Sequence, residues 1–301
     1  MMNKSILTSF GVALSALLLA TLPACAQNLR FGDIDKLPKP KADARIAYGK
    51  DPLQFGDLRL PAGKGPHPVV IVIHGGCWLA EYNLEHLSAF SDALTKAGVA
   101  TWSLEYRRVG SPGGGWPGTF QDVAQGADYV RELAKKYPLD LSRVIVIGHS
   151  AGGHLALWLA ARKKLPKNSE LYTVNPLPLQ GVISLAGVTD LAKFAPGCGG
   201  AIAKLLGGTP EEMPARYQQT SPLELLPLGV PQHLINGARD RIVPLEQGAS
   251  YEAAAKKKGD QVRLTVLENA AHFELVSPQA AEWPVIQEAV LAMLNQKTQG
   301  K

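Results

Sequence analysis

The feature that most constrains the fold is a repeated alternation of short, β-branched apolar runs with longer amphipathic stretches. Residues 69–73 read Val-Val-Ile-Val-Ile, with no polar residue between them, which predicts a strand covered on both faces. Further strands are expected at 99–104, 144–147, 181–185, 233–235 and 262–267, and helices at 84–96, 120–137, 152–163, 245–258 and 284–296. Strands that alternate with helices predict an α/β fold, with a mostly parallel central sheet and helices on both faces.

Two departures from this alternation refine the prediction. Weaker strand patterns at 44–48 and 54–60 are expected to form an antiparallel edge of the sheet. After the sixth expected strand, residues 188–230 are rich in Gly and Pro and too long for a simple crossover. We expect a small insertion there, over the strand ends where open sheets of this kind bind ligands. No linker interrupts the pattern, so residues 44–301 are predicted to form one domain.

The first 26 residues have a different character. Lys4 precedes an uncharged apolar stretch over 6–22, and small residues at Ala24 and Ala26 flank Cys25 before Gln27. This order is typical of a secretory signal peptide, which predicts export to the periplasm or the medium. The apolar stretch is shorter than the roughly 20 residues of a spanning helix, which disfavours a retained anchor.

An alternative for the same segment is a bacterial lipobox. Residues 22–25 read Leu-Pro-Ala-Cys, which would place a lipid on Cys25, although Pro23 fits that pattern poorly. Residues 27–43 are polar and contain Pro38 and Pro40, and they are expected to be an extended lead-in to the domain.

Composition excludes several classes of function. The chain has 301 residues, 46% of them hydrophobic, and a formal net charge of only +5 with its Lys and Arg scattered. A nucleic-acid partner would require clustered basic residues with interleaved aromatics, and none is seen. The seven His are dispersed without an H-x-x-x-H or C-x-x-C pair, so no metal site is expected. The oligomeric state is left open.

A G-x-S-x-G motif marks the expected nucleophile. Gly148-His149-Ser150-Ala151-Gly152 comes directly after the strand at 144–147 and directly before a helix. In that context the serine lies on a tight strand-to-helix turn that exposes its hydroxyl at the sheet edge. We therefore predict Ser150 as the nucleophile. The alternative is a glycine-rich turn that carries a passive serine.

A serine nucleophile needs a base, and the base needs a group that orients it. In this type of fold the chain order is Ser, then Asp or Glu, then His. Asp240 follows the strand at 233–235, and His272 follows the last strand, so both are expected at the same sheet edge as Ser150. Asp190 is the rival acid, and a turn or cap is the structural alternative for Asp240.

The loop after the strand at 69–73 is expected to hold the oxyanion. It reads His74-Gly75-Gly76-Cys77-Trp78, which corresponds to an HGGG-type loop with cysteine as its third glycine. The backbone N–H groups of Gly76 and Cys77, together with that of Ala151, are the predicted donors. We assign His74 a structural role, because His272 fills the position of the base.

Together these segments resemble the α/β-hydrolase superfamily over nearly all of residues 44–296. HGGCW, Glu105-Tyr106-Arg107 and GHSAGGHLALWLAAR resemble hormone-sensitive-lipase-like carboxylesterases, kynurenine-formamidase-like enzymes and small prolyl-oligopeptidase-type esterases. The resemblance implies hydrolysis of small carboxylic esters, including acetyl or feruloyl esters, through an acyl-enzyme and without a cofactor. Amide, formamide or small-peptide hydrolysis on the same triad is the alternative. A further alternative is a non-catalytic binding protein that has kept the fold.

Two expectations concern the surroundings of the triad. Trp78 and Trp116 are candidates for lining a substrate pocket, whereas Trp158 is expected in the core. Cys77 and Cys198 lie in loops that should emerge at the same sheet edge, and in an oxidising compartment they are hypothesised to form a disulfide. Two separate thiols are the alternative.

Overall fold

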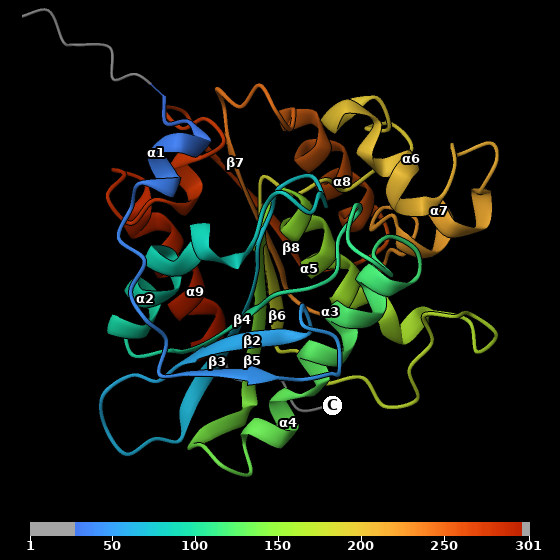
Figure 1. Ribbon diagram of the computed structural model, residues 1–301. Helices are drawn as coiled ribbons and strands as arrows, with labels where there is room; N and C mark the ends of the chain where they lie inside the picture. Colours follow the sequence, from blue (N-terminus) through green and yellow to red (C-terminus); the bar gives the residue numbers. More distant parts are fainter. Residues whose placement is uncertain (1–27, 297–301) are drawn as a thin grey trace, which may run out of the picture.

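A computed structural model describes residues 28–296, so the expected signal peptide and Cys25 lie outside the described residues. The described chain forms an eight-stranded sheet in the order β1-β2-β4-β3-β5-β6-β7-β8 (Figure 1). Its strands are β1 Ala44–Ala47, β2 Phe55–Arg59, β3 His67–Ile73, β4 Ala100–Leu104, β5 Leu139–His149, β6 Gly181–Leu185, β7 Gln232–Gly237 and β8 Val262–Leu267. At one edge, β1 pairs antiparallel with β2, and β2 pairs antiparallel with β4. All the remaining neighbours, from β4 to β8, pair parallel. The predicted mostly parallel sheet with an antiparallel edge is confirmed.

The central strands are buried on both faces, as their uninterrupted apolar runs predict. Val69, Ile71 and Ile73 of β3 pack into one hydrophobic cluster. Val70 and Val72 of the same strand pack into the other. Successive side chains of a strand point to opposite faces, so a strand without polar residues requires a cover on each side.

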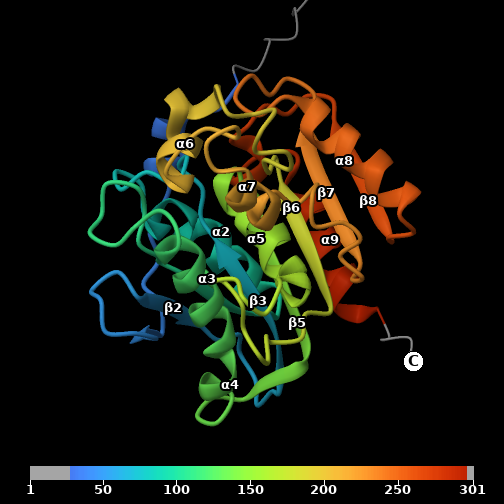
Figure 2. The same ribbon diagram turned by 90° about the vertical axis from the view of Figure 1, so that its right-hand side faces the viewer.

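Helices provide those two covers (Figure 2). The layer on one face consists of α3 Gly118–Asp128, α4 Val130–Leu133, α5 Ala151–Ala161 and α8 Leu245–Lys257. The layer on the other consists of α2 Ser88–Lys96 and α9 Trp283–Asn295. Every residue of α5 is buried, so this helix belongs to the core. Among residues 28–296, no helix is both long and apolar enough to cross a membrane.

Two helices differ from the sequence prediction. The helix expected over 120–137 begins earlier, at Gly118, and is divided at Tyr129 into α3 and α4. The helix expected over 84–96 begins with the 3-10 turn η1 Leu84–Leu87, which Asn83 caps by accepting the N–H of Glu85 at 2.9 Å. Periodicity alone does not distinguish a continuous helix from two short ones on the same face.

The predicted insertion lies between β6 and β7. It contains η3 Gly197–Gly200, α6 Ala201–Leu206 and α7 Pro214–Thr220, which Figure 1 shows at the upper right. A disulfide joins Cys198 of η3 to Cys77 of the loop after β3, with the two Cα atoms 5.7 Å apart and a sequence separation of 121. This hypothesised bond is therefore present, and it ties the insertion to the sheet edge.

The prediction of an extended lead-in is wrong for residues 31–35, which form helix α1, Phe31–Asp35. Ile34 of this helix is only 1% exposed and packs into the hydrophobic cluster of α2 and α9. The apolar side chain of Ile34 thus anchors this segment. The polar neighbours of Ile34 and the two prolines had indicated an extended conformation. Tertiary packing determines the conformation here, because a single turn of helix has little stability of its own.

Replacing both Cys77 and Cys198 by alanine should lower the free energy of unfolding by about 2–4 kcal/mol, because an unfolded chain without the bond is less constrained. Urea unfolding of the oxidised protein and of the double variant measures this difference. Added dithiothreitol should destabilise the unsubstituted protein and leave the double variant unchanged. Equal stability of all four samples would contradict a structural disulfide.

Candidate active site

Ser150 occupies a tight turn between β5 and α5. Its backbone has φ 56° and ψ −122°, a conformation that non-glycine residues rarely adopt. The turn is possible because Gly148 and Gly152 approach closely: a Cβ on Gly148 would collide with the carbonyl of Gly152. Such local strain is typical of sites where a side chain must be held in one place. The N–H of Ser150 donates to the carbonyl of Leu185 in β6 at 2.8 Å, which fixes the turn to the neighbouring strand.

Asp240 and His272 are joined as the sequence predicts. Nδ1 of His272 lies 2.6 Å from Oδ2 of Asp240, and the two side chains are 5% and 0% exposed. The other carboxylate oxygen of Asp240 accepts the N–H groups of Ile242 and Val243 at 2.7 and 3.0 Å. These backbone bonds hold the carboxylate in the orientation that meets the imidazole.

The rival acid Asp190 has a different role. Its Oδ1 accepts the N–H of Lys193 at 3.0 Å, a bond within its own loop. Within the described part of the chain, its carboxylate makes no hydrogen bond to His272. The geometry therefore favours Asp240 as the residue that orients the histidine.

His149 connects the histidine loop to the turn of the nucleophile. Its Nε2 lies 3.0 Å from the carbonyl oxygen of His272, and the two imidazole rings are 4.4 Å apart. Since His149 directly precedes Ser150, this contact places His272 beside the nucleophile. The hydrogen bond between Ser150 Oγ and His272 Nε2 is the one link of the triad that the described residues do not form. Such bonds commonly tighten only when substrate binds.

The loop after β3 lies directly against Ser150. A Cβ on Gly75 would be 3.1 Å from Cβ of Ser150. The next residues, Gly76, Cys77 and Trp78, have φ values of 104°, 52° and 58°. Positive φ values of this kind occur in backbone turns whose successive N–H groups can together bind an anion.

The predicted oxyanion donors are free to bind a ligand. Within residues 28–296, the backbone N–H groups of Gly76, Cys77 and Ala151 donate to no protein acceptor. Ala151 is the first residue of α5, where N–H groups have no intrahelical partner and the helix dipole favours negative charge. Three unpaired donors next to a serine are what a developing oxyanion requires.

A buried network of polar side chains supports the loop that follows β3. Glu105 accepts the N–H of Leu84 at 3.2 Å and forms an ion pair with Arg108. The hydroxyl of Tyr106 donates to the carbonyl of His74 at 2.8 Å, and the Tyr106 ring stacks on the imidazole. Burial, assisted by the Arg108 cation, lowers the pKa of His74 to about 3. His74 is therefore neutral at physiological pH and structural, as predicted.

The prediction that Trp78 lines a substrate pocket is wrong. Its side chain is 0% exposed and packs in the core beside α5. The indole N–H donates to Nδ1 of His154 at 3.2 Å, so His154 donates from Nε2 to the carbonyl of Thr220 at 2.9 Å. The indole thus gains full burial with its one donor satisfied, which a short motif cannot reveal. Trp78 links the oxyanion loop to the insertion.

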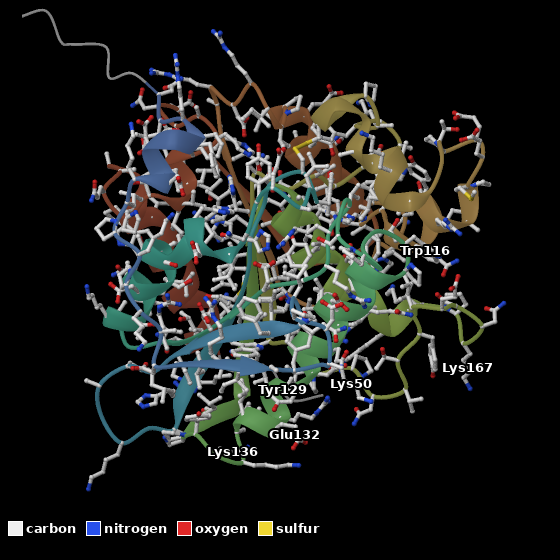
Figure 3. All side chains as sticks on the ribbon, viewed as in Figure 1. Lys50, Trp116, Tyr129, Glu132, Lys136 and Lys167 are labelled. Atoms are coloured by element: carbon white, nitrogen blue, oxygen red, sulfur yellow. A yellow bond between two sulfur atoms is a disulfide. The ribbon has the colours of Figure 1, made fainter. Side chains whose placement is uncertain are left out.

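Trp116 is half-buried and contacts both the insertion and the loop that follows α5. Its indole N–H donates to Glu170 at 3.1 Å, and the Arg216 guanidinium lies 5.2 Å from the ring centre. Figure 3 shows Trp116 on the same side of the molecule as Lys167, which belongs to the loop that contains Glu170. A contact between Trp116 and substrate stays a prediction.

The nucleophile turn comes first along the chain, and the acid and the histidine follow on later loops at the same sheet edge. This order defines the α/β-hydrolase class. The chain belongs to the BD-FAE family, whose model matches residues 57–254. This match includes Ser150 and Asp240 but neither α1 nor His272.

Several of the named relatives are esterases. The chain is 27% identical to the esterase LipC of Mycobacterium tuberculosis over 266 residues, which cover 84% of this chain and 64% of LipC. It is 25% identical to an isoprenylcysteine alpha-carbonyl methylesterase of Arabidopsis thaliana, in an alignment that covers 76% of this chain and 56% of that protein. The chain thus spans between about half and two thirds of the length of these two relatives.

The fold also matches solved structures. A truncated carbohydrate esterase from gut microbiota superposes with a TM-score of 0.74 at 23% identity, over 86% of this chain and 98% of that one. An acetyl ester-xyloside bifunctional hydrolase from Caldicellulosiruptor lactoaceticus gives 0.67 at 22% identity, over 84% and 97%. At this level of identity the similarity establishes the shared fold.

Asp240→Asn should lower kcat/KM by about 10⁴-fold, because the amide cannot hold His272 in the tautomer that accepts the serine proton. Asp190→Asn is the matched control and should stay within a few-fold of the unsubstituted enzyme. Steady-state hydrolysis of p-nitrophenyl acetate gives both values. The reverse order of the two variants would show that Asp190 is the acid.

Stability should fall as the pH drops below about 6.5, because several histidines are buried in the neutral form. Burial lowers the pKa of His74 and of His86 to about 3 and that of His154 to about 4. The unfolded chain binds these protons near pH 6.5 and the folded chain does not. Each histidine thus contributes stability that is present above pH 6.5 and declines by about 1.4 kcal/mol per pH unit until its folded pKa is reached.

Urea unfolding between pH 7 and 4.5 measures this slope. Because carboxylates also titrate near the acidic end of that range, the informative comparison is with His154→Gln, which lacks one of the three groups. The variant should show a shallower slope between pH 6.5 and 5, and an unchanged slope would contradict a neutral His154.

Proposed function

We propose that this chain is a serine hydrolase that cleaves carboxylic esters through an acyl-enzyme. The observation that carries the proposal is the hydrogen bond between Asp240 and His272, which lies near a strained serine turn and three backbone N–H groups without a protein acceptor among the described residues. The named esterases among its relatives support the same reaction class.

In the first half of the proposed reaction, Ser150 Oγ attacks the ester carbonyl carbon while Nε2 of His272 takes the hydroxyl proton. The negative charge that develops on the carbonyl oxygen is stabilised by the N–H groups of Gly76, Cys77 and Ala151. Asp240 stabilises the imidazolium that forms. His272 then gives its proton to the leaving alcohol, and the acyl group remains on Ser150.

Water completes the cycle by the same route. His272 removes a proton from a water molecule, whose oxygen attacks the acyl carbon and forms a second oxyanion in the same site. Collapse of this intermediate returns the proton to Ser150 and releases the carboxylic acid. Within this scheme no group other than the substrate and water is consumed.

For the substrate class, we propose small acetyl or feruloyl esters. Two structural neighbours carry names that refer to a carbohydrate esterase and an acetyl ester-xyloside hydrolase, and their fold similarity makes sugar-linked esters a reasonable first test. The second candidate is hydrolysis of amides, formamides or small peptides, which the same triad can perform.

We also propose that the protein acts outside the cytoplasm. Two features support export: the signal-like pattern of residues 1–26 and the Cys77–Cys198 disulfide. Disulfides of this kind persist in oxidising compartments and are rare in the cytosol. Lipidation of Cys25 remains the alternative to a free periplasmic or secreted form.

Ser150→Ala should abolish labelling by a fluorophosphonate probe and lower ester turnover by about 10⁴-fold or more, because the nucleophile is lost. Ser184→Ala, which removes another buried serine hydroxyl from the same sheet, is the control and should still be labelled. A panel of p-nitrophenyl acetate, methyl ferulate, acetylated xylan, N-formylkynurenine and an aminoacyl anilide separates the candidate substrates. Turnover of the anilide above every ester would favour the peptidase alternative.

A further inference from the structure

We propose that the N-terminal segment 29–35 is a positioning element of the active site. Phe31 of this segment fixes the position of the oxyanion loop relative to the loop that carries His272. The inference rests on the proposed function, because it assigns a role to Phe31 in that reaction. It concerns a part of the chain that lies outside the matched family region, residues 57–254.

The segment contacts a loop at the opposite end of the sequence. The N–H of Leu29 donates to Oε1 of Glu274 at 2.6 Å, across 245 residues. Figure 1 shows α1, in blue, beside the red C-terminal part of the chain. The lead-in is therefore attached to the catalytic domain at a defined place.

Glu274 transmits this contact to the catalytic histidine. Its side chain is buried, and its second oxygen, Oε2, accepts the N–H of Ala271 at 3.0 Å. Ala271 directly precedes His272. One carboxylate thus fastens both the N-terminal segment and the backbone that carries the histidine.

Phe31 makes the second connection to the same loop. Its ring meets that of Phe273 with centres 6.1 Å apart, and Phe273 in turn meets the imidazole of His272 edge-on at 5.0 Å. Phe31 comes from a different segment than the adjacent residues His272 and Phe273, and edge-to-face pairs of this kind have a preferred geometry. The ring of Phe31 therefore limits where the Phe273–His272 pair can move.

On its other side, Phe31 reaches the oxyanion loop. Its ring meets Tyr82 edge-on, with centres 5.0 Å apart. Tyr82 packs directly on Gly76, where an added Cβ would overlap the tyrosine side chain. Gly76 is one of the three predicted oxyanion donors.

These contacts form a continuous path from Gly76 through Tyr82, Phe31 and Phe273 to His272. The donor Gly76 and the base His272 belong to loops that follow different strands, β3 and β8, and their relative position decides whether both can act on one substrate carbonyl. A shift of about 1 Å between catalytic groups can lower the rate by about 100-fold. Phe31 is half-buried and contacts both loops, so it is placed to prevent that shift.

The test compares Phe31→Ala with Phe55→Ala on p-nitrophenyl acetate. Phe55 is a half-buried ring on the edge strand β2, packed under the Arg45 guanidinium, and serves as the matched control. We expect kcat of Phe31→Ala to fall by about tenfold or more, while KM changes by no more than about twofold. Phe31→Tyr, which keeps the aromatic edge, should restore most of kcat.

A second measurement does not depend on turnover. Hydrogen exchange should accelerate in residues 75–82 and 270–275 of Phe31→Ala, and neither segment should change in Phe55→Ala. If Phe31→Ala does not fold, Phe31→Leu carries the same two measurements, because it keeps an apolar side chain and loses the ring.

Three results would overturn the inference: unchanged kcat in Phe31→Ala, unchanged exchange in both loops, or a raised KM with kcat intact. The last result would make Phe31 a direct substrate contact. Failure of the proposed function is distinguishable, since the unsubstituted protein would then hydrolyse no ester of the panel whatever the exchange rates show.

Discussion

The close approach of backbones around Ser150 is the constraint on which the rest of the site depends. A Cβ on Gly152 would collide with the carbonyl of Ile73 at the end of β3. On the other side, a Cβ on Gly153 would come within 2.7 Å of Cα of Gly187, after β6. Helix α5 can therefore begin between the ends of β3 and β6, the two strands that flank β5, only where side chains are absent.

That constraint also explains where the other functional groups are found. With α5 seated against β3 and β6, the loop that follows β3 lies against Ser150, where Gly75 approaches the serine side chain. The loops after β7 and β8 emerge at the same edge of the parallel sheet and supply Asp240 and His272. The buried pairs beneath the oxyanion loop, Glu105 with Arg108 and Tyr106 with His74, keep it from relaxing into another shape.

Much of this arrangement could be predicted from the sequence because it depends on local patterns. The uninterrupted apolar run of β3 predicts a doubly covered strand, and G-x-S-x-G between a strand and a helix predicts the turn at Ser150. The topology of a parallel sheet then brings Asp240 and His272 to one edge without knowledge of any side-chain contact. Even the approach of Cys77 to Cys198 follows from two loops sharing that edge.

The features that escaped prediction depend on contacts between distant segments. Trp78 belongs to a glycine-containing loop that looks exposed, yet its indole is buried and donates its N–H to His154, which donates in turn to Thr220 of the insertion. Helix α1 is too short to be recognised by periodicity. It forms because Ile34 packs into the hydrophobic cluster that contains residues of α2 and α9. The contact of the His149 ring with the His272 ring was also not predicted. The one sequence feature that could have indicated it is the position of His149 next to Ser150 in the motif.

Cys77 combines two duties in one residue, since its side chain forms the disulfide and its backbone N–H is free to bind the oxyanion. Its left-handed backbone would suit glycine better, but glycine there would remove the covalent tie. Protein produced in a reducing cytosol and protein produced by export would therefore differ in the bonding of Cys77, a predicted oxyanion donor. Preparations of this enzyme are comparable only when their thiol content has been established.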